Sequence, residues 1–63
     1  MNEEMLKKFE GHLVKIFCIG SILWTGRVLK IYDDSLLIRD KFSKEVIVSF
    51  SSIQNIQDLG VGF

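Results

Sequence analysis

The chain has 63 residues, 48% of them hydrophobic, and its eight basic side chains balance its eight acidic ones. This length predicts one domain over residues 1–63, and the balanced charge excludes the strongly basic footprint of a generic nucleic-acid binder. The single cysteine excludes an intrachain disulfide, so we expect this small chain to gain stability by associating with copies of itself.

Residues 2–10 are predicted to form a short helix, capped by Asn2 and ended by Gly11. Its narrow apolar stripe must dock on the rest of the domain, because so short a helix is marginal in water. The segment lacks the basic stretch and apolar core of a signal peptide, and no apolar run in the chain is long enough to span a bilayer. We therefore expect a cytoplasmic protein with no membrane partner.

The rest of the chain alternates apolar runs with short polar segments, which is the pattern of β-strands joined by hairpins. Turns are predicted at residues 20–21, 33–35, 41–44 and 51–52. The predicted strands are residues 12–19, 22–33, 36–40, 45–50 and 53–59, followed by a tail at residues 60–63.

The second predicted strand determines the architecture, because it is too long to be straight. Its twelve residues would span about 40 Å, whereas a compact chain of this length has a radius of gyration of only about 11 Å. Gly26 is the expected position of a sharp bend, since a glycine inside a strand often marks a barrel corner. Side-chain alternation also requires a bulge near Leu29–Lys30 to bring Val28 and Ile31 to one face.

These features predict a mainly β fold. A short N-terminal α-helix is followed by a five-stranded, strongly bent antiparallel sheet, which forms a small open barrel over residues 12–59.

The small and apolar positions of the first three strands resemble the first motif of the Sm/LSm family, including its Hfq-like members. The positions that carry the likeness are Gly20, Gly26, Val28, Asp33, Leu36 and Ile38. The segment IVSFSSIQNI resembles the shorter second motif, in which strand four runs through a tight turn into strand five. The resemblance covers nearly the whole chain, and it implies an Sm-like (SH3-like) barrel that assembles into a homo-oligomeric ring and binds single-stranded RNA.

The chain departs from the family pattern at the residues that bind uridine in RNA-binding members. The Asn that usually follows the motif's Asp is absent, as is the Arg-Gly of the second motif, and residues 48–51 stand where Hfq has Tyr-Lys-His. The spacing from Gly26 to Asp33 is one residue longer than usual, which is the same extra residue that strand alternation requires.

In an Sm-like ring, the loops at residues 32–35 and 50–52 would face the pore. Single-stranded RNA is bound by aromatic and cationic side chains, and several of each lie in these loops or on the central strands. The basic group on the central strands and the following loop consists of Arg27, Lys30, Arg39, Lys41 and Lys44. The candidate RNA-binding residues are Tyr32, Asp33, Ser35, Arg39, Phe50 and Ser51.

The expected subunit interface lies at the two strands that an open barrel leaves unpaired on one side. If strand four of one copy pairs with strand five of the next, the apolar positions of those strands meet. The candidate interface residues are Val46, Val48, Ile53 and Ile56.

No residue cluster predicts catalysis, a metal site or a cofactor. His12 is the only histidine and starts a strand, and Cys18 is expected to be a small buried hydrophobe. Asp33 and Asp34 are expected to be turn formers. We predict a non-enzyme, which is either the RNA-binding ring or a barrel that serves as a structural or protein-interaction module with no nucleic-acid role. The balanced charge and the missing motif residues are the basis of the second alternative.

Overall fold

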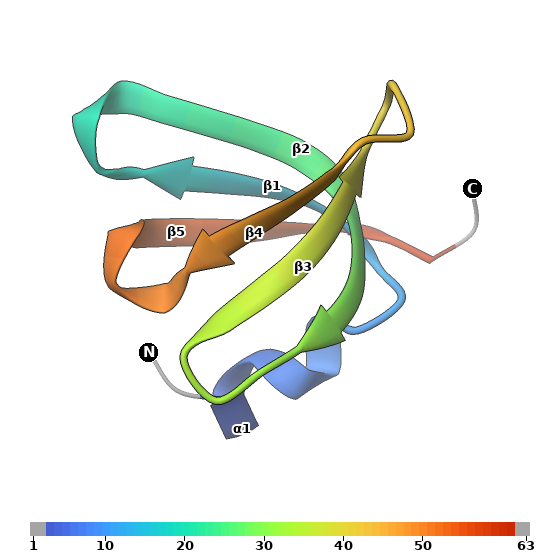
Figure 1. Ribbon diagram of the computed structural model, residues 1–63. Helices are drawn as coiled ribbons and strands as arrows, with labels where there is room; N and C mark the ends of the chain where they lie inside the picture. The colour runs from blue at the N-terminus through green and yellow to red at the C-terminus, as the bar shows by residue number, and fades with distance from the viewer. Residues whose placement is uncertain (1–2, 62–63) are drawn as a thin grey trace.

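The computed structural model describes residues 3–61, which form one short helix followed by five antiparallel strands (Figure 1). A 3₁₀ turn at Lys7–Phe9 continues the helix, and two further 3₁₀ turns, Ile19–Ser21 and Phe50–Ser52, connect strands. The elements are α1 (Glu3–Leu6), β1 (Leu13–Cys18), β2 (Ile22–Ile31), β3 (Ser35–Asp40), β4 (Glu45–Ser49) and β5 (Ile53–Gly60). The predicted mainly β fold with a short N-terminal helix is confirmed.

The five strands form a single antiparallel sheet in the order β4-β3-β2-β1-β5. Strands β1 to β4 pair consecutively through hairpins, whereas β5 returns to pair with β1. The sheet is strongly curved in Figure 1, but within residues 3–61 no pairing between β4 and β5 closes it. β4 and β5 are therefore the two edges of the sheet.

Gly26 faces the backbone of β3 so closely that no side chain fits at this position. A Cβ atom at this position would collide with the carbonyl oxygen of Arg39 and lie 3.0 Å from its carbonyl carbon. It would also lie 3.3 Å from the Cα atom of Asp40. Because these are backbone atoms of β3, a side chain cannot be fitted here without moving a strand, and glycine is required.

The predicted bulge in β2 is confirmed. Between Val28 and Lys30 the pairing advances two residues along β2 but only one along β3, so Leu29 is an extra residue in β2. Both Val28 and Ile31 are buried as a result. The bulge also increases the local bend, which helps the long strand to curl with the sheet.

The helix is shorter than predicted. After α1 the chain tightens into a 3₁₀ turn, in which the Glu10 N–H donates to the Lys7 carbonyl oxygen at 3.1 Å. Gly11, with φ of +81°, ends this segment as predicted, because a left-handed backbone is easy only for glycine. The predicted start at residue 2 and its cap, Asn2, lie outside the described residues.

Two strand ends also differ from the prediction. β2 ends at Ile31 and not at residue 33, because the Tyr32 N–H donates to the Ser35 carbonyl oxygen at 2.8 Å and closes the hairpin. β5 continues through Gly60, which pairs with Leu13, so the predicted tail begins later than residue 60. Residues 62–63 of that tail lie outside the described part of the chain.

The buried side chains form one hydrophobic cluster, and none of the buried residues in the described range is polar or charged. Leu6 docks the helix on this cluster, whereas Met5, from the same predicted stripe, is exposed. The cluster consists of Leu6, Val14, Ile16, Cys18, Val28, Ile31, Leu36, Ile38, Val48 and Phe50.

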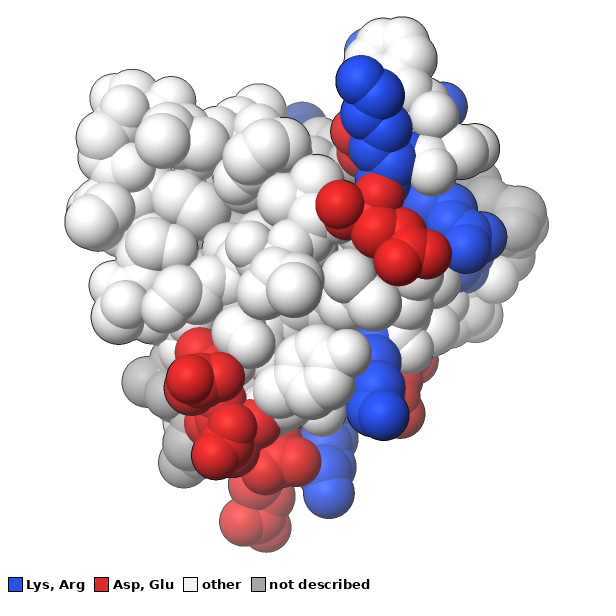
Figure 2. All heavy atoms as spheres, viewed as in Figure 1, with Lys and Arg blue, Asp and Glu red and all other residues white. Residues whose placement is uncertain are grey.

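One face of the molecule has almost no charge. Figure 2 shows uncharged atoms over the β1–β2 turn and the β4–β5 turn, with the charged side chains gathered elsewhere. This follows from the sequence, because residues 16–26 and 46–57 contain no charged side chain. Ile19, Ile22 and Leu23 are each about half exposed on the β1–β2 hairpin.

Candidate functional site

Two turns that are distant in the sequence lie together at one end of the sheet. The Phe50 N–H donates to the Asp34 carbonyl oxygen at 2.9 Å, which ties the β4–β5 turn to the β2–β3 turn. Ser35 pairs with Ser49 at the adjoining ends of β3 and β4. A surface hollow of about 400 Å³ lies between the turns, and we call it the turn hollow; it is lined by Asp33, Asp34, Ser49, Phe50 and Ser51.

The turn hollow presents carboxylates and hydroxyl groups. The Ser49 and Ser51 Oγ atoms are 2.9 Å apart, and the Ser52 hydroxyl donates to the Ser49 carbonyl oxygen at 2.8 Å. The lining carboxylates of Asp33 and Asp34 accept hydrogen bonds and repel phosphate groups. The hollow is therefore suited to hydrogen-bond donors, such as the N–H groups of a nucleobase or a peptide.

The aromatic side chain available for stacking is Tyr32 and not Phe50. Phe50 is only 7% exposed and belongs to the core, whereas Tyr32 is 37% exposed. The Lys30 Nζ atom lies 5.5 Å from the centre of the Tyr32 ring, within the range of a cation–π contact. Tyr32 and Lys30 therefore supply an aromatic surface and a positive charge beside the acidic turn.

The structure brings most of the predicted RNA-binding residues together but separates one of them. Tyr32, Asp33 and Ser35 lie in or next to the β2–β3 turn, and Phe50 and Ser51 line the hollow opposite them. Arg39 lies near the other end of β3, where it pairs with Arg27. Arg39 was included in the predicted site as a cation of the central strands, but three residues of extended chain separate it from Ser35.

Asp34 and Ser49 were missed as lining residues of the turn hollow. Asp34 was expected to be a turn former within the loop at residues 32–35 but was not named as a candidate contact, and Ser49 lies at the end of an apolar strand. The short polar run at residues 49–52 was the sequence signal for these lining residues. Once β3 and β4 pair, its hydroxyl groups lie opposite the acidic turn.

The four candidate interface residues lie on the edge strands but face their own core. Val48 is buried in the core cluster, and Val46, Ile53 and Ile56 pack against it while partly exposed. The exposed apolar residue of β4 is Ile47, which has 67% of its surface in contact with solvent. Its position follows from strand alternation, since it occupies the face opposite to Val46 and Val48.

His12 joins the start of β1 to the edge strand β5. Its Nδ1 atom lies 3.0 Å from both carboxylate oxygens of Asp58. Asp58 also accepts a hydrogen bond from the Gly60 N–H at 2.9 Å. The hydrogen bond from His12, followed by that from Gly60, lowers the pKa of Asp58. The pair lies next to the irregularity between Leu13 and Val14 in the β1–β5 pairing, so it helps to hold β5 in place.

Within residues 3–61, no group of three or more His, Cys, Asp or Glu side chains is placed to hold a metal ion. None of the helices in this range is long and apolar enough to cross a membrane.

Comparison with known proteins identifies no family for this chain. No family model matches the chain, and no curated protein matches its sequence.

Proposed function

We propose that this chain is a subunit of an Sm-like homo-oligomeric ring that binds single-stranded RNA. The single observation that carries the proposal is the open sheet, whose edges β4 and β5 have no neighbouring strand on their outer sides within the described chain. An exposed strand edge readily adds a strand from another molecule. Pairing β4 of one copy with β5 of the next would satisfy both edges of every subunit.

The surface composition supports association. Ile47 on β4 is largely exposed, and the uncharged face of Figure 2 includes the turn that joins β4 to β5. Partly exposed Val46, Ile53 and Ile56 would lose the rest of their surface if the edges paired. Removing apolar surface from water is favourable by about 25 cal/mol for each Å².

The RNA part of the proposal rests on the turn hollow. In a ring of this kind the turns that form it would face the pore, so each subunit would present Tyr32 for stacking and Asp33, Asp34 and Ser51 for hydrogen bonds to bases. Stacking on an aromatic side chain contributes about 1–3 kcal/mol per base. Identical sites repeated around the ring would add to the affinity of a strand that spans several of them.

Light scattering tests the assembly. A single chain has a mass of 7.3 kDa, and we expect a multiple of this mass at micromolar concentration. Ile47→Lys places a charge on the edge strand and should shift the protein toward the monomer. Thr25→Lys, at an exposed position on the interior strand β2, is the matched control and should leave the mass unchanged. A wild-type mass of one chain would contradict the proposal.

Fluorescence anisotropy with oligo-U and oligo-A, at low and at physiological salt, tests RNA binding. Tyr32→Ala should weaken binding by roughly 5- to 150-fold, the equivalent of one lost stacking contact. Phe42→Ala removes an aromatic ring that is 71% exposed in the β3–β4 loop, at the other end of β3 from the turn hollow, so it should weaken binding less than Tyr32→Ala. No binding by the wild-type protein at tens of micromolar would exclude the RNA role.

A protein-interaction module with no nucleic-acid role is the second candidate. The observation that favours it is the pair of carboxylates, Asp33 and Asp34, in the turn hollow. Asp33→Asn/Asp34→Asn separates the alternatives. Each Asn keeps an acceptor oxygen for a base but no longer repels phosphate groups, so RNA that binds at this hollow should bind more tightly. A module with no RNA role stays inactive toward RNA in both forms.

A further inference from the structure

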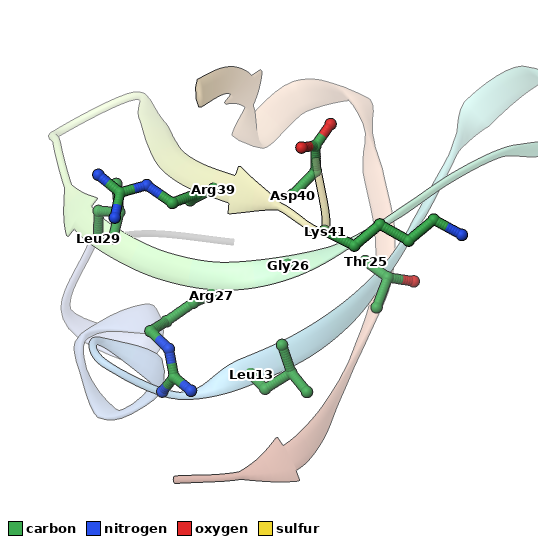
Figure 3. A pocket seen from close by; sticks show the side chains of 8 residues that line it. All are labelled: Leu13, Thr25, Gly26, Arg27, Leu29, Arg39, Asp40 and Lys41. Carbon is green, nitrogen blue, oxygen red and sulfur yellow. The ribbon is translucent and has the colours of Figure 1, made fainter. Parts of the chain in front are cut away.

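A second hollow, of about 330 Å³, lies at the opposite end of β3 from the turn hollow (Figure 3). Gly26, where β2 and β3 lie close together, forms part of its lining, and its walls are mainly apolar. We call it the arginine hollow. The residues on which its chemistry depends are Leu13, Arg27, Leu29, Arg39 and Lys41.

The strand pairing places two positive charges directly opposite each other in this hollow. Arg27 of β2 and Arg39 of β3 are register partners, and like charges in directly opposed positions destabilise a strand pair. Lys41 adds a third cation from the loop that follows β3. The chain as a whole has no net charge, so this concentration of cations is a local feature.

At the β3 end of the hollow, the acidic side chain near Arg39 only partly offsets its charge. The Arg39 guanidinium lies 3.4 Å from the Glu45 carboxylate, and both side chains are about half exposed. An exposed ion pair of this length contributes little. The Oδ1 atom of Asp40 accepts hydrogen bonds from the Phe42 and Lys44 N–H groups, both at 2.9 Å. Asp40 is thus engaged by the backbone of its own loop, and Figure 3 shows its carboxylate turned away from Arg27.

The directions of the cationic side chains indicate the shape of the ligand. In Figure 3, Arg39 extends toward Leu29, Arg27 extends on the other side of β2 toward Leu13, and Lys41 extends away from both. The cations therefore surround the hollow and do not converge on one point. A single small anion would contact only one of them, whereas an extended chain of phosphates can contact several.

We propose that the arginine hollow binds the phosphate backbone of single-stranded RNA through Arg27, Arg39 and Lys41. This inference rests on the proposed RNA-binding function and adds a second contact surface to it. The apolar walls at Leu13 and Leu29 can accommodate a sugar or a base, while the arginines neutralise the phosphates. The two surfaces have different roles in RNA binding. The turn hollow contacts the bases, and the arginine hollow contacts the RNA backbone without regard to sequence.

The double variant Arg27→Gln/Arg39→Gln tests this division by fluorescence anisotropy over a range of salt concentrations. Each lost phosphate contact on a single strand should lower the slope of log K against log salt by about 0.7, so the double variant should lose about 1.4 for each subunit that the RNA touches. At 0.1 M salt this slope corresponds to a loss of affinity on the order of 25-fold for each subunit that the RNA touches. Oligo-U and oligo-A should be affected equally, because phosphates carry no sequence information.

Two controls separate this effect from loss of fold and from general charge. Arg27→Lys/Arg39→Lys keeps both positive charges and should retain the wild-type salt slope, while Lys7→Gln/Lys8→Gln removes two exposed cations from the 3₁₀ turn after α1 and should not weaken binding comparably. Thermal unfolding checks that each variant is folded, since Arg27 also donates to the Gly11 carbonyl oxygen at 2.7 Å.

The outcomes distinguish this inference from the proposed function. If the wild-type ring binds RNA and the folded Arg27→Gln/Arg39→Gln variant binds equally well, the arginine hollow is not a contact surface, but the ring remains an RNA binder. An equal loss in Lys7→Gln/Lys8→Gln would also overturn the inference, because the effect would then be one of net charge. If the wild-type ring binds no RNA, both proposals fail.

Discussion

Gly26→Ala adds a single methyl group at a position where the backbone of β3 leaves no room for it. The new carbon would meet the carbonyl oxygen of Arg39, with the carbonyl carbon of Arg39 at 3.0 Å and the Cα atom of Asp40 at 3.3 Å. All three are backbone atoms, so no side-chain rotation relieves the contact. One strand must move, and this movement disturbs the pairing on which the curvature of the sheet depends.

The expected loss in the free energy of unfolding follows from how closely the added carbon approaches the backbone of β3. Overpacking a well-packed site costs about 1–3 kcal/mol, and we expect Gly26→Ala to lie at the upper end because the obstacle is backbone. A chain of 63 residues is stable by only about 3–9 kcal/mol at the usual 0.05–0.15 kcal/mol per residue. Gly26→Ala should therefore remove a large part of the stability, and the bulkier Gly26→Val should prevent folding unless the wild type lies at the upper end of that range.

Urea unfolding followed by fluorescence measures this effect, because Trp24 is the only tryptophan and is partly buried against the core. All variants are compared at one protein concentration, since association raises the apparent stability. We expect the midpoint for Gly26→Ala to fall by roughly 1–2 M urea.

Gly20→Ala is the matched control. Gly20 has φ of +77° but nothing lies within 4 Å of its added Cβ atom, so only backbone strain of about 1–2 kcal/mol is expected. An unchanged midpoint for Gly26→Ala, or a loss smaller than that for Gly20→Ala, would refute the steric argument and place the bend elsewhere in β2.

Three further predictions concern the core, the β3–β4 loop and the β5 edge. Leu36→Ala should cost about 2–5 kcal/mol in urea unfolding, because Leu36 is fully buried, whereas Phe42→Ala in the exposed β3–β4 loop should stay within about 0.5 kcal/mol. Asp40→Ala should cost about 1–2 kcal/mol by removing the acceptor of two loop N–H groups, and Asp40→Asn, which keeps an acceptor oxygen, should cost less; equal losses would contradict this role. Asp58 has a lowered pKa in the folded chain, so its stabilising contribution should be present above its ordinary pKa and be lost as the pH falls below about 4. Acid titration of unfolding should thus show a steeper decline for the wild type than for Asp58→Asn, and parallel curves would contradict it.

Periodicity allowed the β-sheet to be predicted, because strand formation is governed by local patterns. Alternation required an extra residue near Leu29–Lys30, and the pairing places the bulge at Leu29. The turns at residues 20–21, 33–35 and 51–52 were predicted from residue types that tolerate turn geometry. The helix was predicted too long, because Asn2 and Gly11 were used as its ends, whereas α1 ends at Leu6, the residue that contacts the core.

The candidate site was predicted only in part, because the pairing of distant strands decides which side chains meet. Residues 32–35 and 50–52 were grouped as pore-facing loops through the family resemblance, which remains a prediction, and the contact between them depends on a hydrogen bond between Phe50 and Asp34. Phe50 was expected to stack on bases, yet its ring is buried, since the turn that follows β4 directs it into the core.

The sequence by itself determined that this chain forms a small curved sheet: its composition, its strand alternation and Gly26 are local properties, and they leave few other ways to bury the apolar residues. Only the tertiary structure decided that Arg39 lies opposite Arg27 and that His12 reaches Asp58. These contacts join residues 12 and 46 positions apart. They depend on the register between strands, which is set by the sum of the packing over the whole sheet and cannot be obtained from any one segment.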